Sequence, residues 1–299
     1  MRCAATLQVA LAICNCLPTC LASPIKVMSF NVRYDGSPKV ADEGENAWFA
    51  ANGKHRRDLI GLAVREFAPD ILCVQEALKN QVDDIRAILP THGFYGVGRD
   101  DGVERGEHCG IFFQQDRFDR RHSGTFWLNS DSSVAGTKFP GTCCARIASW
   151  CVFRDRQNQE REILVVNTHW DHQIQAARIY SAKLIRRKLA AIAAGMSIVV
   201  AGDLNVPDAN EAFRKLVRPS EQYPLALLDT YRVVHPAVAK AEGTYHAFRG
   251  KNDGHRIDYV LHDSTLRCVK ADIIRLHEGA RYPSDHFPVT ATLTFQNDD

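Results

Sequence analysis

Apolar runs of strand length alternate with polar segments and helical patterns along most of this chain. Strand-like runs are expected at residues 25–31, 71–74, 110–113, 123–128, 146–153, 163–167, 197–201, 256–261, 272–276 and 288–295. Apolar residues at helical spacing predict helices over 54–67, through 85–89, over 173–193 and over 207–217. Two β-sheets packed face to face, with helices outside, satisfy this pattern, and residues 93–170 are expected to form a mostly antiparallel meander.

Composition places the chain among ordinary globular proteins. It has 299 residues, of which 45% are hydrophobic and 24% are charged. The net charge of +2 is too small to indicate a nucleic-acid partner, although a basic groove can exist within a nearly neutral total. The basic residues of the helix over 173–193 are interpreted as its solvated face.

The N-terminus predicts a secretory signal peptide over residues 1–22. Arg2 precedes an apolar stretch over residues 4–17, and Cys20-Leu21-Ala22 places small residues before Ser23. The alternative is a buried helix, which Pro18 disfavours by interrupting the run. We therefore expect a secreted, extracellular domain over residues 23–299 without a transmembrane segment. Six cysteines would remain, which permits disulfides of undetermined pairing: Cys73, Cys109, Cys143, Cys144, Cys151 and Cys268.

Polar side chains that can carry chemistry follow several of the apolar runs at the point where each run stops. They occur in Gln75-Glu76, in Asn167-Thr168-His169, in Gly202-Asp203-Leu204-Asn205 and in Ser284-Asp285-His286. Strand ends are where folds of alternating strands and helices gather their functional groups. The set combines oxygen ligands with imidazoles, and it suits a divalent metal and the hydrolysis of phosphate esters.

Each group has a chemical role that its residue type allows. Glu76 and the amide oxygen of Asn31 form the kind of sparse oxygen site that Mg²⁺ occupies. Asp203 supplies an acceptor for an attacking water, and Asn205, two residues further on, supplies an amide.

The imidazoles would act on the phosphate itself. His169 and His286 can stabilise negative charge on phosphoryl oxygens or protonate a leaving oxygen, and Asp258 is a plausible orienting carboxylate for His286.

Taken together and in order, these segments resemble the endonuclease/exonuclease/phosphatase superfamily. The matching stretches are Met28-Ser29-Phe30-Asn31-Val32-Arg33, Val74-Gln75-Glu76, Asn167-Thr168-His169, Gly202-Asp203-Leu204-Asn205, Arg256-Ile257-Asp258-Tyr259 and Ser284-Asp285-His286. The resemblance implies a four-layer α/β sandwich of two mixed sheets, with the active site at one edge of the sheets. It also implies a hydrolase dependent on Mg²⁺ or Mn²⁺.

The resemblance assigns roles to the individual residues. Glu76, Asn31 and Asp285 would hold the metal, whereas the catalytic set would be His169, Asp203, Asn205, Asp258 and His286. Which imidazole acts as the acid differs among family members and stays open. A less characterised branch of the family adds Arg146, as a clamp on the substrate phosphate, and His172.

The substrate is the least determined feature. We expect a monomeric enzyme that cleaves phosphodiester bonds, with nucleic acid as the preferred substrate. A phosphomonoesterase or a phospholipid phosphodiesterase on the same scaffold is the alternative. A binding module that has lost its chemistry is disfavoured, because every expected acid and imidazole is present.

Overall fold

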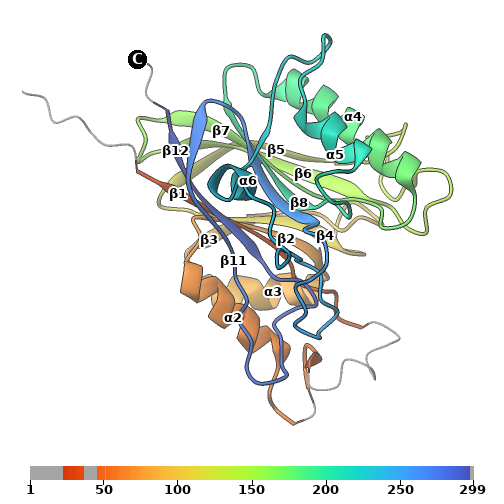
Figure 1. Cartoon of the computed structure of the whole chain (residues 1–299), viewed down its shortest axis with the longest axis vertical. Coiled ribbons are helices and arrows are strands. Elements are labelled where there is room, and N and C mark those ends of the chain that lie inside the picture. The colour runs from red at the N-terminus through yellow and green to blue at the C-terminus, as the bar shows by residue number, and fades with distance from the viewer. Residues whose placement is uncertain (1–22, 37–45, 51, 297–299) are drawn as a thin grey trace, which may run out of the picture.

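Two six-stranded sheets packed face to face form the centre of the molecule (Figure 1). The computed structural model describes residues 23–36, 46–50 and 52–296. Helices α2 (Arg56–Phe67) and α3 (Lys79–Ile88) cover the outer face of one sheet. Helices α4 (Gln175–Ile192) and α5 (Glu211–Val217) cover the other sheet, so the four layers follow one another from bottom to top in Figure 1. The predicted fold class is confirmed.

Both sheets are mixed. The first has the order β11 (Leu266–Ile273), β12 (Val289–Phe295), β1 (Ile25–Asn31), β2 (Ile71–Ala77), β4 (His108–Gln114) and β3 (His92–Tyr95). The second has the order β5 (Phe118–Trp127), β6 (Ile147–Asp155), β7 (Arg161–His169), β8 (Ser197–Asp203), β10 (Asp258–His262) and β9 (Leu228–Asp229), with the short helix α6 (Thr230–Val234) after β9. Strands β1 and β2 are parallel, as are β7 and β8. The polar segments that follow these strands therefore lie together at the carboxyl-terminal edge of each sheet.

Apolar side chains on the central strands alternate between two cores. Val27 of β1 and Val165 of β7 point into the space between the sheets, whereas Met28 and Leu164 point outwards to the helical layers. This period of two is what a pleated strand imposes. Strands covered on both faces lack a polar side, which explains their nearly continuous apolar sequence.

Two sequence expectations differ from the structure. The segment over 93–170 is not one meander, because β3 and β4 pair in the first sheet while β5, β6 and β7 form a meander in the second. An apolar strand buried on both faces carries no sequence signal of the sheet it joins. Strand β11 spans Leu266–Ile273 rather than 272–276, since alternately buried and exposed side chains weaken its apolar run.

The structure bears on the cysteines but not on the predicted signal peptide. The predicted signal peptide lies outside the described residues. Within the described part of the chain, no helix is long and apolar enough to cross a membrane. All six cysteines after residue 22 are unpaired, and the sulfurs of Cys143 and Cys144 lie 3.2 Å apart.

A buried amide joins the two sheets beside the functional edge. The Nδ2 of Asn167 in β7 donates to the carbonyl oxygens of Val74 in β2 and Gly110 in β4, both at 2.8 Å. Its Oδ1 accepts a 2.7 Å hydrogen bond from the side chain of Gln75. Directly after Val74 the register between β2 and β4 shifts, and Glu76 takes a left-handed backbone with φ of 65°. The amide thus fixes the break in the ladder from which Glu76 projects.

Replacing this amide should destabilise the protein strongly. Asn167→Leu keeps the approximate volume of the side chain but removes the hydrogen bonds to Val74, Gly110 and Gln75. Because a buried polar group left without a partner costs roughly 1–3 kcal/mol, we expect the free energy of unfolding to fall by about 3 kcal/mol or more. Urea unfolding measures this change. The exposed control Asn80→Ala should stay within about 0.5 kcal/mol of the wild type, and an equally small effect of Asn167→Leu would contradict the bridging role.

Candidate active site

The polar strand ends meet in a pocket of about 510 Å³ at one edge of the two sheets. Asn31, at the end of β1, lies beneath it and connects the two sheets. Its Nδ2 donates to Glu76 Oε1 of the first sheet at 2.9 Å and to Asp203 Oδ2 of the second sheet at 3.0 Å. Residues around the pocket that carry charge or chemistry include Arg33, Glu76, Arg99, Glu107, Arg146, His169, His172, Asp203, Asn205, Asp285 and His286.

The Gly-Asp-x-Asn segment forms a tight turn that presents Asp203. A Cβ at Gly202 would lie 2.0 Å from the carbonyl oxygen of Thr168 on β7, so only glycine fits there. Asp203 Oδ1 accepts the backbone N–H of Asn205 at 2.9 Å, and Asn205 has a left-handed φ of 53°, which asparagine tolerates well. The turn leaves Asp203 Oδ2 directed towards both imidazoles, 3.5 Å from His169 Nε2 and 3.8 Å from His286 Nε2.

Asp258 contacts the ring of His286. His286 Nδ1 lies 2.9 Å from Asp258 Oδ2, and both side chains are buried. Asp258 and Asp203 are also directly opposite one another in the antiparallel pair of β10 and β8. Burial, together with the negative charge of Asp258, raises the pKa of Asp203 to about 7.

The two imidazoles differ in charge state. Burial alone would lower the pKa of His286, but its contact with Asp258 and the nearby charges of Asp203 and Asp285 hold it well above the ordinary value. Burial lowers the pKa of His169, and the neighbouring Arg146 and Arg99 lower it further. These opposite shifts favour the protonated form of His286 and the neutral form of His169. Two histidines whose pKa values are shifted in opposite directions can take different roles, one as proton donor and the other as acceptor.

Cationic donors face these groups across the pocket. Arg146 is only 8% exposed, and its Nη2 lies 3.1 Å from His172 Nδ1. Its buried Nε and Nη1 have no hydrogen-bond partner, and neither has the Nε of Arg99. Buried guanidinium donors are rarely left unpaired, and planar guanidinium groups match phosphate oxygens. The arrangement is suited to an anionic ligand.

The acids fit a divalent cation. Burial raises the pKa of Glu107 to about 7, with a further contribution from Glu76, and burial also raises the pKa of Asp285. Glu76 differs, because His286, Asn31 and Arg33 together overcome the effect of its burial and lower its pKa. Glu76 also contributes to the raised pKa of Asp285, and carboxylates gathered this closely are typical of a cation site. Glu76, with Asp285, would supply hard oxygen ligands, the kind that Mg²⁺ and Mn²⁺ prefer.

The structure brings all ten sequence-predicted residues to this one place. Eight line the pocket, and the other two, Asn31 and Asp258, lie directly beneath it. The Oδ1 of Asn31 accepts a hydrogen bond from the backbone N–H of Arg33, and its Nδ2 donates to the carboxylates of Glu76 and Asp203. Asn31 therefore positions Glu76 and Asp203 in this geometry, and its role as a metal ligand stays a prediction.

Sequence reasoning did not assign a role to several residues of the site. Arg33 approaches Glu76 at 3.7 Å and Asp285 at 3.8 Å. Glu107 pairs with Arg99 at 2.6 Å and lies 3.8 Å from His169 Nδ1. Glu107 directly precedes β4, which is antiparallel to β2, so the start of β4 lies at the same edge as the end of β2. This pairing places Glu107 in the site.

A sequence model described as the endonuclease/exonuclease/phosphatase family matches residues 28–286. The chain belongs to this family. Members of the endonuclease/exonuclease/phosphatase family are phosphoesterases that use a divalent metal, and the acids and imidazoles described above are its expected functional groups. Among curated proteins, no sequence matches this chain significantly.

Solved structures of the family resemble the chain over nearly its whole length. A family protein from Bacteroides vulgatus is 31% identical, with a TM-score of 0.80, and the match covers 92% of this chain and 100% of that one. A second, from Bacteroides thetaiotaomicron, is 28% identical, with a TM-score of 0.80 and coverage of 93% and 97%. A mannosyl-6-phosphatase from Bacteroides thetaiotaomicron is 28% identical, with a TM-score of 0.77 and coverage of 91% and 100%.

Removing the carboxylate beside His286 should change how its charge depends on pH. A raised pKa in the folded state keeps the cation until pH rises through that pKa. In Asp258→Asn the ring loses its main anionic partner, so we expect it to lose its proton at lower pH than in the wild type. NMR titration of His286 measures the shift, and the alkaline limb of the pH–rate profile should move in the same direction. Exposed Asp116→Asn is the control; an unchanged titration in Asp258→Asn would refute the pairing.

Proposed function

We propose that this protein is a metal-dependent phosphoesterase that hydrolyses a small phosphate monoester. The unpaired donors of Arg146 and Arg99, buried beside Asp203 and the two imidazoles, carry this proposal. These N–H groups have no hydrogen-bond partner in the protein, so they are available to donate to a phosphate. The proposed Mg²⁺ or Mn²⁺, bound by Glu76 with Asp285, would polarise a phosphoryl oxygen and offset negative charge.

The residues of the chain divide the remaining work. Asp203 Oδ2, between the two imidazoles, orients the attacking water and accepts its proton. Protonated His286 donates a hydrogen bond from Nε2 to the phosphoryl oxygens on which negative charge develops. Asp258 holds its ring in place. Asn205, which donates to the carbonyl oxygen of Trp170, presents its amide at the rim of the same pocket. Neutral His169 assists the leaving oxygen.

The dimensions and charge of the pocket favour a terminal phosphate. A monoester presents three terminal oxygens and up to two negative charges, and Arg33, Arg99 and Arg146 all line the pocket. A pocket of about 510 Å³ accommodates a small phosphorylated molecule such as a sugar phosphate. The similarity to a mannosyl-6-phosphatase at 28% identity supports the same substrate class.

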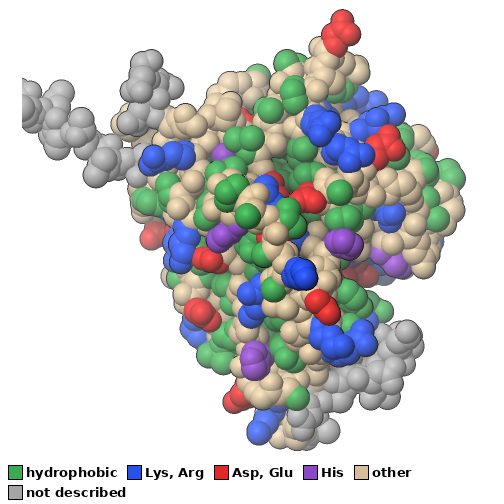
Figure 2. All heavy atoms as spheres, in the orientation of Figure 1, with side chains coloured by type: hydrophobic (Ala, Val, Ile, Leu, Met, Phe, Trp, Pro, Cys, Tyr) green, Lys and Arg blue, Asp and Glu red, His purple; other side chains and the backbone are tan. Residues whose placement is uncertain are grey.

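A nuclease is the second candidate, in line with the preference from the sequence. A separate concavity of about 720 Å³ between α4 and α5 is lined by six basic residues and one acid. Basic side chains gather over these helices at the upper right of Figure 2. Lys183, Arg187 and Arg218 have no acidic partner within 4 Å among the described residues, and a nucleic-acid backbone could use such a surface. This surface lies outside the catalytic pocket, so it supports nuclease action less directly.

Removal of the metal should abolish activity reversibly. A chelator should stop hydrolysis of p-nitrophenyl phosphate, and Mg²⁺ or Mn²⁺ should restore it. Glu76→Gln should raise the metal concentration needed for half-maximal rate by about tenfold or more, because it weakens a charged ligand. The exposed control Glu162→Gln should behave as the wild type. Activity that survives the chelator would sink the metal assignment.

A comparison of substrates tests the monoester preference. We expect p-nitrophenyl phosphate and mannose 6-phosphate to be hydrolysed with higher kcat/KM than bis(p-nitrophenyl) phosphate, single-stranded DNA or RNA. Arg146→Lys keeps the charge but removes the planar donors, so kcat/KM for the monoester should fall by about 10- to 100-fold. Exposed Arg121→Lys is the matched control. Faster cleavage of DNA or RNA would favour the nuclease instead.

A further inference from the structure

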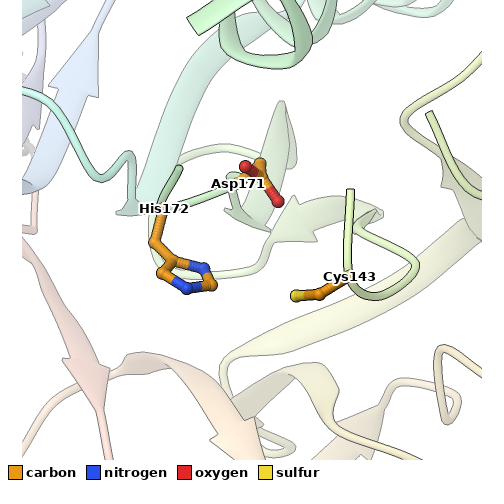
Figure 3. A group of neighbouring side chains, drawn as sticks. All are labelled: Cys143, Asp171 and His172. Carbon is orange, nitrogen blue, oxygen red and sulfur yellow. The ribbon is translucent and has the colours of Figure 1, made fainter. Parts of the chain in front are cut away.

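A second group of potential metal ligands lies at the rim of the catalytic pocket (Figure 3). One ligand atom each from Cys143, Asp171 and His172 lies within 4.8 Å of the others. Cys143 comes from the loop before β6, whereas Asp171 and His172 come from the connection between β7 and α4. Figure 3 shows the sulfur of Cys143 and the ring of His172 turned towards one another beside the carboxylate of Asp171. These residues take no part in the proposed hydrolysis, apart from the contact of His172 with Arg146.

Asp171 supplies an independent indication of a ligand site. Its Oδ1 accepts the backbone N–H groups of Gln173 and Ile174 ahead of α4, at 2.9 and 2.6 Å. Its Oδ2 has no hydrogen-bond partner, although the residue is only 2% exposed. Buried carboxylate oxygens are normally paired, and a bound cation is one way to satisfy such an atom.

We propose that Cys143, Asp171 and His172 form a binding site for a thiophilic divalent ion such as Zn²⁺, distinct from the catalytic metal. Thiolate, imidazole and carboxylate are the ligands that Zn²⁺ takes, whereas Mg²⁺ prefers oxygen alone. Binding replaces the proton of the Cys143 thiol by a zinc–sulfur bond and releases that proton to solvent. The proposed catalytic metal, by contrast, is bound by the carboxylate of Glu76 and has no sulfur ligand.

The geometry allows the ligands to close on an ion. Zinc–ligand bonds of roughly 2.0–2.3 Å place neighbouring tetrahedral ligands about 3.3–3.8 Å apart, so ligand atoms within 4.8 Å of one another need to approach by at most about 1.5 Å. Cys143 and His172 are exposed, so their side chains have room to adjust, while Asp171 is held at Oδ1. The sulfur of Cys144, 3.2 Å from that of Cys143, is within reach of the fourth position.

Occupation of this site would affect catalysis through Arg146. His172 Nδ1 now lies 3.1 Å from Arg146 Nη2, so the ring supports the guanidinium that we assign to the substrate phosphate. An ion bound to His172 takes away this acceptor and adds positive charge beside Arg146. Zinc is therefore expected to inhibit by weakening the hold of Arg146 on the phosphate, which raises KM.

Cobalt substitution tests the site without reliance on activity. The reduced protein, titrated with Co²⁺, should develop the near-ultraviolet absorption of a thiolate–cobalt bond. Cys143→Ser should lose this band, whereas Glu76→Gln should retain it, since the catalytic metal has no sulfur ligand. Cys268→Ser, a cysteine remote on β11, is the matched control and should also retain the band. Absence of the band in the wild type, or its persistence in Cys143→Ser, would overturn the proposal.

Zinc inhibition gives the second readout. Each variant is compared with its own rate without zinc, at saturating Mg²⁺. The zinc concentration for half-inhibition should rise by about tenfold or more in Cys143→Ser, as expected for the loss of a ligand. Equal inhibition of Cys143→Ser and wild type would place the inhibitory ion at the catalytic site and contradict the coupling to Arg146.

Discussion

A hydrogen-bonded amide buried between the two sheets holds the functional edge together. Asn167 ties β7 to both β2 and β4 at the point where the ladder between those two strands breaks. The break gives Glu76 its left-handed backbone, and Asn31 then ties Glu76 to Asp203 across the sheets. The candidate catalytic groups come from two different sheets, so their relative positions depend on polar contacts such as these between the sheets. Apolar packing alone would hold the sheets together without fixing one against the other to the precision that catalysis needs.

The charges of the site follow from this framework. Asp258 and Asp203 face one another on neighbouring strands, and His286 contacts the first while it approaches the second. Asp203 and Glu107 also approach His169, but burial lowers the pKa of this ring and the nearby Arg146 and Arg99 lower it further, so the two imidazoles differ in pKa. The surroundings of each ring therefore shift the pKa values of the two histidines in opposite directions in this chain.

The sequence predicted much of the fold and most of the site, for identifiable reasons. Apolar runs that end in polar residues placed Glu76, His169 and Asp203 at strand ends, and parallel pairing then brought those ends together. The division of residues 93–170 between two sheets was not predictable, because strands buried on both faces carry no mark of their partners. Glu107 was missed for a related reason: it joins the site only through the antiparallel pairing of β4 with β2.

The opposed carboxylates of Asp203 and Asp258 have a consequence for how the protein tolerates change. A buried charge facing another of the same sign lowers the stability of the folded chain, and the effect grows as pH rises and Asp203 ionises. Groups that lower stability in this way are commonly retained at functional sites. Random substitution selected for heat resistance alone would tend to remove it, yielding a sturdier protein that has lost its chemistry. At these two positions, selection for thermostability and selection for turnover therefore favour different residues.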